Sequence, residues 1–348
     1  MTPARLTQDI KQWALELGFN AVGISGVDLS EDEARLCNWL AQGRHGEMHY
    51  MERHGTKRSR PATLVPGTTR VISVRMDYFP EPAAPAEPIL ASPEQAYVSR
   101  YALGRDYHKL MRQRLQQLAE CITEVTGPFG YRAFVDSAPV MEKALARNSG
   151  LGWIGKHTNL LAKDAGSWFF LGELYINLPL VEDSAGEDHC GRCNACMNAC
   201  PTGAIVAPYE LDARLCISYL TIEHHGAIPE TLRPAMGNRI YGCDDCQLVC
   251  PWNRFADDTQ EPDFWPRHTL DAATLTQLFR WSAEEFDMKL RGSAIRRIGH
   301  DRWLRNIAVA LGNGPATADA IHALHARQRH PNELVREHVK WALARLNL

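Results

Sequence analysis

The chain has 348 residues, which is enough for two or three domains, and its formal net charge of −3 says little about its partners. Hydrophobic residues make up 45% and charged residues 23%, as is usual for a protein that folds in water. No apolar run approaches the roughly 20 residues that cross a bilayer, so we expect a cytoplasmic protein without membrane contact, in which cysteines stay reduced.

The chain begins with a predicted helix rather than a targeting segment. Ile10, Ala14 and Leu17 recur on one helical face of the first 18 residues. Asp9 and Glu16 interrupt this stretch, so it lacks the uniform apolar core of a signal peptide.

The first half of the chain has the pattern of a mixed α/β region. Apolar and β-branched runs and one amphipathic stretch predict three strands and a long helix, at residues 70–79, 131–139, 167–178 and 106–125 respectively. Residues 79–93 contain five prolines and are predicted to form a surface loop.

A carboxylate follows the predicted strand at 131–139. Asp136, in "AFVDSAPVMEKAL", precedes a Ser-Ala-Pro turn and a predicted helix. Strand ends in α/β folds often face ligand crevices, and a carboxylate among apolar neighbours can have a raised pKa and donate a proton. Alternatively, Asp136 or Ser137 only caps the following helix.

The stretch "SGLGWIGKH" contains Gly150, Gly152, Gly155 and Lys156 in a spacing close to both a dinucleotide fingerprint and a P-loop. Both motifs require a strand before the glycines and a helix after them. A helical pattern precedes the glycines here, and His157 stands where a P-loop has Ser or Thr. We therefore expect a turn near a cofactor, without nicotinamide or ATP binding.

Eight of the ten cysteines lie between residues 190 and 250. The run "CGRCNACMNACP" has the C-x2-C-x2-C-x3-C-P spacing of bacterial ferredoxins, in which the Cys before Pro serves a second cluster. The run "CDDCQLVCP" has the same ending but lacks one leading Cys, which Cys216 can supply. The remaining two, Cys37 and Cys121, lie in predicted helices as small hydrophobic residues.

This spacing predicts two [4Fe–4S] clusters with four thiolates each. The first set is Cys190, Cys193, Cys196 and Cys250, and the second set is Cys200, Cys216, Cys243 and Cys246. Zinc is the alternative, but a zinc site gives no reason for two C-x3-C-P endings. Two adjacent clusters would carry single electrons to a reaction site elsewhere in the chain.

The C-terminal tail is basic and helical in pattern. Residues 289–348 contain eleven Lys or Arg and four Asp or Glu, which favours a polyanionic partner such as nucleic acid over a merely solvated face. The stretches 302–313 and 333–346 have similar helical patterns, as in HEAT-type paired-helix repeats. The predicted class is thus mixed α and β, with an α/β region (1–185), a ferredoxin-like region (186–265) and an all-α region (266–348).

Several long motifs occur together in one order: "SRYALGRDYHK", "VDSAPVMEKALARNSGLGWIGKHTNLL", "GSWFFLGEL", "CGRCNACMNACPTGAI", "CISYLTIEHHG" and "YGCDDCQLVCPWN". In this set the chain resembles the tRNA epoxyqueuosine reductase family from its N-terminus to beyond Pro251. The resemblance implies that the chain reduces epoxyqueuosine to queuosine at the tRNA wobble position, the last step of queuosine synthesis.

The resemblance also implies the cofactors and the site residues. It implies cobalamin, with a cob(II)alamin resting state, held in the α/β region, and two [4Fe–4S] clusters. Asp106 and His108 begin a D-x-H-x-x-G cobalamin motif, but Met111 stands where Gly is needed, so we expect no protein histidine on cobalt. Asp136 would protonate the departing oxygen. The implied cobalamin contacts are Arg58, Arg100, Asp136, Thr158, Asn159, Ser167, Ser218, Tyr219, Asp244 and Gln247. His224 and the helical tail would contact tRNA, an unidentified electron-transfer protein would supply electrons, and we expect a monomer.

Two other functions fit parts of this pattern. A reductive dehalogenase would share the cobalamin and clusters, but such enzymes usually carry a twin-arginine export signal that the chain does not show. A non-catalytic electron carrier or nucleic-acid adaptor would not need some 180 residues and a strand-end acid ahead of the clusters. Cobalamin binding by purified protein would separate these functions.

Overall fold

The computed structural model describes residues 1–80 and 83–347 of the chain. Its centre is a four-stranded sheet in the order β1-β2-β7-β4, in which all neighbouring strands are antiparallel. These strands are Ala21–Ser25, Arg70–Asp77, Phe169–Ile176 and Tyr131–Phe134. Both long strands, β2 and β7, are buried along almost their whole length, which explains their nearly continuous apolar sequences.

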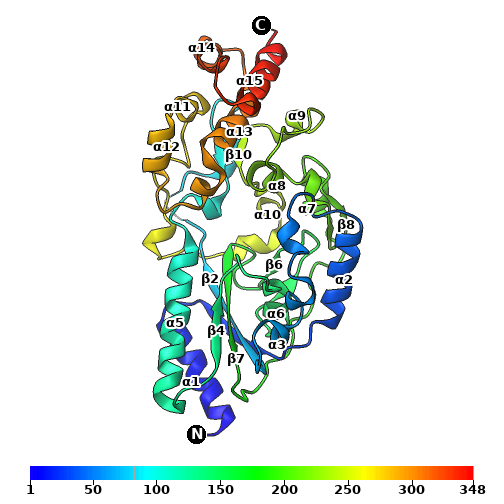
Figure 1. The fold of residues 1–348 in the computed structure, drawn as a ribbon, viewed down its shortest axis with the longest axis vertical. Coiled ribbons are helices and arrows are strands. Elements are labelled where there is room, and N and C mark those ends of the chain that lie inside the picture. Colours follow the sequence, from blue (N-terminus) through cyan, green and yellow to red (C-terminus); the bar gives the residue numbers. More distant parts are fainter. Residues whose placement is uncertain (81–82, 348) are drawn as a thin grey trace.

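Helices cover both faces of this sheet (Figure 1). The helices α1 (Pro3–Glu16) and α5 (Tyr107–Thr126) pack on one face through the predicted apolar stripes, including Ile10 and Leu118. On the other face, the short helix α6 (Glu142–Asn148) packs against Val71 and Tyr175. The predicted positions of all four elements in this region, strands 70–79 and 167–178 and helices 1–18 and 106–125, are thereby confirmed within a few residues.

Two local predictions differ from the structure. The strand predicted at 131–139 ends at Phe134, because Asp136 adopts a φ of 45° that breaks the extended chain. The surface loop predicted at 79–93 contains a helix, α4 (Ala86–Ala91), and residues 81–82 lie outside the described residues. Proline is tolerated in the first turn of a helix, and Ile89 is buried there.

The cysteine-rich part of the chain consists of short elements. The helices α7 (Ala195–Ala199), α8 (Ile217–Ile222) and α10 (Asp245–Leu248) carry or adjoin its cysteines. A hairpin is formed by β8 (Ile205–Ala207) and β9 (Glu210–Leu211). The strand β10 (Arg239–Tyr241) pairs in parallel with β3 (Tyr97–Val98). This pairing places the segment that leads into α5 beside the segment that leads into the second cysteine run.

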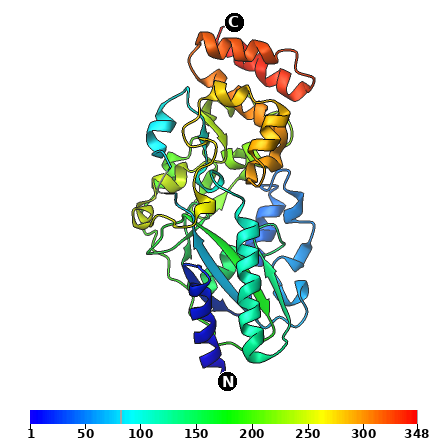
Figure 2. The same cartoon turned by 90° about the vertical axis from the view of Figure 1, so that its left-hand side faces the viewer.

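Helices form the end of the molecule that lies opposite the N-terminus (Figures 1 and 2). There α13 (Gly299–Asn313) and α15 (Glu333–Arg345) pack together around a core that includes Trp303 and Val339. Ala96 and Leu103 share that core, although they precede it by some two hundred residues. The division at residues 185 and 265 and the HEAT-type repeat stay predictions.

The remaining elements are short or peripheral. They are α2 (Ser30–Ala41), α3 (Pro61–Leu64), β5 (Trp153–Ile154), β6 (Leu160–Leu161), α9 (Arg233–Met236), α11 (Leu275–Phe279), α12 (Ala283–Lys289) and α14 (Ala318–Arg327), with 3-10 turns η1 (His49–Met51), η2 (Gly55–Lys57), η3 (Arg100–Ala102), η4 (Ala213–Leu215), η5 (Pro251–Phe255), η6 (Pro262–Phe264) and η7 (Ala294–Ile298). Among the described residues, none of the helices has the length and apolarity needed to cross a membrane.

Candidate functional site

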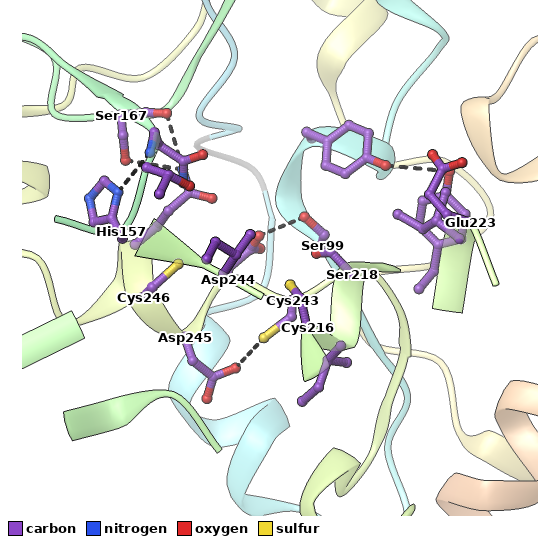
Figure 3. Close-up of a pocket in the computed structure, with 18 of the residues that line it drawn as sticks. Ser99, His157, Ser167, Cys216, Ser218, Glu223, Cys243, Asp244, Asp245 and Cys246 are labelled. Carbon is purple, nitrogen blue, oxygen red and sulfur yellow. Dashed lines mark hydrogen bonds between the residues drawn. The ribbon is translucent and has the colours of Figure 1, made fainter. Parts of the chain in front are cut away.

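A cavity of about 760 Å³ lies between the sheet, the glycine turn, both cysteine runs and the start of α13. Figure 3 shows part of its lining, with side chains from several distant segments around one space. Most of the predicted site residues line it: Asp136, Thr158, Asn159, Ser167, Ser218, Asp244, Gln247, Cys200, Cys216, Cys243 and Cys246. The structure therefore brings together residues that are spread over more than a hundred positions of sequence.

The other predicted residues are not among the lining residues of the cavity: Arg58, Arg100, Tyr219, His224, Cys190, Cys193, Cys196 and Cys250. The guanidinium groups of Arg58 and Arg100 are buried and donate hydrogen bonds to backbone carbonyl oxygens. Tyr219 Oη accepts a hydrogen bond from the backbone of Glu47, and His224 Nδ1 lies 3.0 Å from Glu47 Oε1. These contacts give each of the four side chains a structural partner.

The two predicted cysteine sets differ in their relation to the cavity. All four cysteines of the predicted second set line the cavity, whereas Cys193 of the first set is exposed to solvent. Burial raises the pKa of the Cys196 thiol, and the neighbouring thiols of Cys250, Cys190 and Cys193 raise it further. The first set is therefore gathered in space although Cys250 is distant in sequence.

The glycine turn supports the first cysteine run. Its glycines precede and follow the strand β5, which forms a hairpin with β6, so the context required by a P-loop is absent from this segment. Lys156 Nζ instead donates hydrogen bonds to the carbonyl oxygens of Gly191 and Cys193, at 2.8 and 2.9 Å. The lysine that looked like part of a nucleotide motif thus holds the cysteine loop against the cavity wall.

Buried hydrogen bonds fix the second cysteine run. The carboxylate of Asp244 accepts from Tyr97 Oη, Ser99 Oγ and the backbone N–H of Arg100, at 2.6 to 2.8 Å. Gln247 Nε2 donates to Ser167 in β7's preceding turn, at 3.0 Å to the carbonyl oxygen. Because these polar groups satisfy one another inside the protein, they hold the cavity wall in one arrangement.

Asp136 lies in the loop between β4 and α6, and its side chain is 53% exposed, toward the cavity. The helix α6 begins only at Glu142 and has no side-chain cap, so the alternative that Asp136 or Ser137 caps this helix is wrong. Asp136 Oδ2 lies 3.3 Å from Nε2 of His108, a buried residue of α5. The carboxylate is thus free to meet a ligand on its exposed side.

The pKa of Asp136 is lowered, whereas the sequence analysis expected a raised pKa. Burial raises the pKa of Asp136, but the hydrogen bond and charge of His108, the Tyr107 hydroxyl and the charge of Arg297 outweigh it and lower the pKa. Burial and the charge of Asp136 raise the pKa of the neighbouring Glu142 to about 8. Of this pair, Glu142 is therefore the carboxyl group that keeps its proton at neutral pH, and Asp136 is ionised beside His108, whose own pKa is raised by the two neighbouring aspartates.

The lining also includes residues that were not predicted as site residues, among them His108, Glu142 and His157. His157 is 4% exposed, and its Nδ1 accepts a hydrogen bond from the backbone of Asn159 at 3.1 Å. Its Nε2 has no partner among the described residues, and burial lowers its pKa to about 4. A neutral imidazole with one unused nitrogen suits a polar ligand in the cavity.

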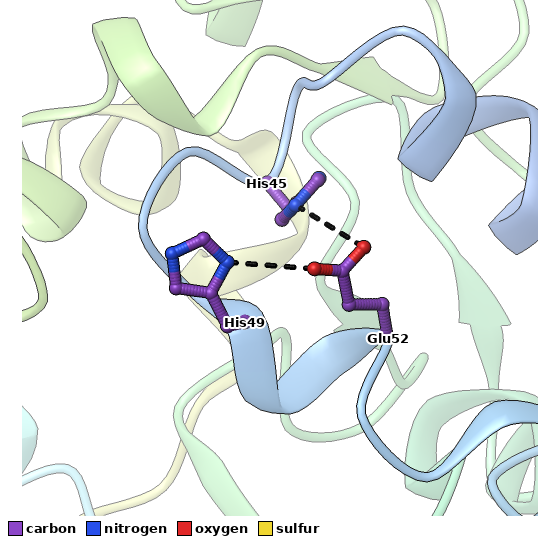
Figure 4. Close-up of side chains that lie close together, drawn as sticks. All are labelled: His45, His49 and Glu52. Atoms are coloured by element: carbon purple, nitrogen blue, oxygen red, sulfur yellow. Dashed lines mark hydrogen bonds and ion pairs between the residues drawn. The ribbon is translucent and has the colours of Figure 1, made fainter.

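A separate group of potential metal ligands lies around η1, with His45 buried and the other two residues exposed (Figure 4). Ligand atoms of His45, His49 and Glu52 lie within 4.8 Å of one another. The His49 side chain is 75% exposed and Glu52 is 52% exposed, with 3.4 Å between His49 Nδ1 and a Glu52 oxygen. The exposed pair of His49 and Glu52 beside the buried His45 accounts for this geometry without an ion.

Two family models match the chain. One, described as "Epoxyqueuosine reductase QueG, DUF1730", covers residues 58–137, and one described as "4Fe-4S double cluster binding domain" covers residues 189–253. The second segment includes all eight clustered cysteines, which favours iron–sulfur clusters over zinc.

Relatives match over nearly the whole chain. An epoxyqueuosine reductase of Pseudomonas aeruginosa is 64% identical over 99% of this chain and 95% of its own length. The Escherichia coli enzyme of that name is 59% identical over 98% and 89%. A solved epoxyqueuosine reductase with an epoxyqueuosine-modified tRNA stem loop has a TM-score of 0.90 and 27% identity, over 99% of this chain and 91% of that one. A Bacillus subtilis epoxyqueuosine reductase, described with a catalytic aspartate loop swung out of its active site, also has a TM-score of 0.90. This chain belongs to the epoxyqueuosine reductase family.

Proposed function

We propose that this chain reduces epoxyqueuosine to queuosine in tRNA, with two [4Fe–4S] clusters and cobalamin as cofactors and Asp136 as the proton donor. The observation that carries the proposal is that the four cysteines of the second set and the carboxylate of Asp136 line the same cavity. Such a cavity can receive electrons from one wall and a proton from another. The relatives named above are reductases of this substrate.

The clusters would be held by the two cysteine sets. The first cluster takes Cys190, Cys193, Cys196 and Cys250, and the second takes Cys200, Cys216, Cys243 and Cys246. The exposure of Cys193 supports electron entry at the first cluster. The position of the second set in the cavity lining supports electron delivery there.

The cavity suits cobalamin in size and chemistry. Its volume of about 760 Å³ falls in the range of cofactor pockets, and the unpartnered His157 Nε2 offers a polar contact. The residues that would hold the corrin are Thr158, Asn159, Ser167, Ser218, Asp244, Gln247 and His157. The resemblance also implies contacts from Arg58, Arg100 and Tyr219. These three residues are not in the cavity lining and would support it through their contacts with neighbouring backbone. When bound, cobalamin supplies a cobalt centre that accepts electrons singly and reacts with carbon.

Asp136 would give a proton to the oxygen that leaves the epoxide. Loss of that oxygen leaves an alkene, consumes two electrons and two protons, and releases water. An alkoxide is a poor leaving group, so an acid beside it lowers the barrier. The substrate RNA would be held by the basic helical tail and His224. A monomeric state, a cytoplasmic location and an electron-transfer partner stay predictions.

The test is reduction of an epoxyqueuosine-containing tRNA stem loop by anaerobic protein that carries cobalamin and a chemical reductant. Mass spectrometry of the released nucleosides should show the loss of one oxygen atom, and this loss should require both cobalamin and reductant. Unchanged epoxyqueuosine, with cluster iron and cobalamin present at full occupancy, would contradict the proposed function.

A further inference from the structure

His108 lies at the start of α5, between two carboxylates, and is only 7% exposed. Its Nδ1 lies 2.6 Å from Asp106 Oδ1, and its Nε2 lies 3.3 Å from Asp136 Oδ2. Arg297 pairs with the other oxygen of Asp106. Both ring nitrogens thus face a carboxylate, which favours a doubly protonated imidazole, although Arg297 Nη2 also lies 3.2 Å from Nδ1.

The two carboxylates have different tasks. Asp106 caps α5 by accepting the backbone N–H of His108 at 3.1 Å, and its short contact fixes a hydrogen on Nδ1. The nitrogen that can pass a proton to Asp136 is therefore Nε2. It has no ideally aligned hydrogen bond among the described residues, and such bonds often tighten only when the substrate is bound.

We propose that His108 stores the proton that Asp136 passes to the epoxide oxygen, an inference that rests on the proposed function. In the resting site the proton is on His108 Nε2 and Asp136 is a carboxylate. The proton moves from Nε2 to Asp136 Oδ2 and on to the departing oxygen, which becomes a hydroxyl group. Neutral His108 then keeps its Nδ1–H on Asp106.

Solvent supplies the protons that the reduction consumes. The reduction needs two electrons, which the two clusters would supply when bound; both carbon–oxygen bonds of the epoxide break and the carbon–carbon double bond forms. Water reaches the exposed side of Asp136 and restores the proton on His108. The second proton follows the same route, so the oxygen leaves as water. Asp136 is the group that meets the substrate, and His108 is a positioning residue that supplies it.

The surrounding charges agree with this assignment. The charged groups facing His108 are Asp106 at its own helix cap, Asp136 from the loop after β4 and Arg297 from η7, while Glu142 of α6 faces Asp136. Burial lowers the pKa of His108, but the two carboxylates outweigh burial and raise it. Because the pKa of Asp136 is lowered, this residue would be without a proton at neutral pH if no neighbour supplied one.

The rival explanation is that His108 only braces the loop that carries Asp136. The variant His108→Gln separates the two, because glutamine keeps a hydrogen-bonding side chain of similar reach but cannot store a proton. Asp106→Asn removes the charge that favours the protonated ring. The exposed His268, outside the cavity, provides a matched control as His268→Asn.

The experiment measures single-turnover reduction of the modified stem loop between pH 5.5 and pH 8.5, with iron and cobalamin content checked for each variant. We expect His108→Gln to slow reduction on the order of 10²-fold at pH 8 and less than tenfold at pH 5.5, where solvent protonates Asp136 directly. Asp106→Asn should shift the alkaline fall in rate to lower pH. His268→Asn should follow the wild type.

A second measurement does not depend on turnover. Deuterium exchange at the imidazole C2 position, followed by mass spectrometry, gives the pKa of His108 in the resting protein. We expect a value above the ordinary 6.5 and a lower value in Asp106→Asn. A pH-independent loss in His108→Gln, or a His108 pKa below 6.5, would overturn the inference. A wild-type protein that reduces nothing would instead contradict the proposed function.

Discussion

Asp136→Asn tests the chemistry at the cavity with little disturbance of the fold. Asparagine matches aspartate in shape and tolerates the positive φ of 45° at this position, whereas alanine would be strained there. The side chain is 53% exposed, so its replacement leaves no cavity in the core. We expect the free energy of unfolding to change by less than about 1 kcal/mol, with both clusters and cobalamin retained.

The loss of rate follows from the position of the carboxylate. A well-placed general acid contributes about 10² to 10⁴ to the rate. Because Asp136 shares the cavity with solvent, water can replace it in part, and we expect a loss near 10²- to 10³-fold. This factor corresponds to about 3 to 4 kcal/mol of transition-state stabilisation.

The assay is single-turnover reduction of the epoxyqueuosine stem loop at pH 7.5 under anaerobic conditions, with the nucleosides measured by mass spectrometry. Ser137→Ala, at the exposed neighbouring position, is the matched control and should keep the wild-type rate. A rate in Asp136→Asn within threefold of the wild type, with full cofactor content, would refute the assignment of Asp136 as proton donor.

Three further outcomes are expected. Cys246→Ala should lose about four of the eight iron atoms, as measured by colorimetric iron analysis of anaerobic protein. Cys37→Ala, in the helix α2, is the control and should keep all of its iron. Full iron content in Cys246→Ala would contradict the second ligand set. Glu173 is 0% exposed, and its pKa is raised by burial and by the charges of nearby acids. Keeping the buried Glu173 protonated therefore costs free energy of folding that grows as pH rises above the pKa of Glu173 in the unfolded chain. The gain in Tm of Glu173→Gln should grow from pH 5.5 to pH 8. An equal gain at both pH values would argue against a buried neutral acid. Replacing exposed Arg329 and Lys340 with Gln should lower the salt dependence of tRNA binding by up to about two charges, measured by titration at several salt concentrations, and an unchanged slope would place the RNA elsewhere.

The sequence predicted the double-cluster segment that the family model over residues 189–253 supports, because cluster ligands follow a spacing set by the size of the cluster; the division of the cysteines into two ligand sets stays a prediction. It also predicted β2 and β7, whose apolar runs reflect burial on both faces. It did not predict the φ of Asp136, since this value depends on packing of the loop between β4 and α6.

Contacts between distant segments were beyond local patterns. The segment Asp106-Tyr107-His108 appeared to be an incomplete cobalamin motif, and nothing in its spacing indicates that His108 meets Asp136. Likewise, Ala96 and Leu103 have no local signal for packing among the C-terminal helices. Such contacts are set by the tertiary fold, and the local pattern of one sequence does not specify them.

The separation of the two cysteine sets has a consequence for the order of events. Cys193 is open to solvent, whereas the second set forms part of the cavity wall. In the proposed function, an electron donor would therefore meet the first set at the surface while the substrate nucleotide lies in the cavity beside the second set. Both reducing equivalents would then arrive during one encounter with the RNA, without release of a half-reduced nucleotide.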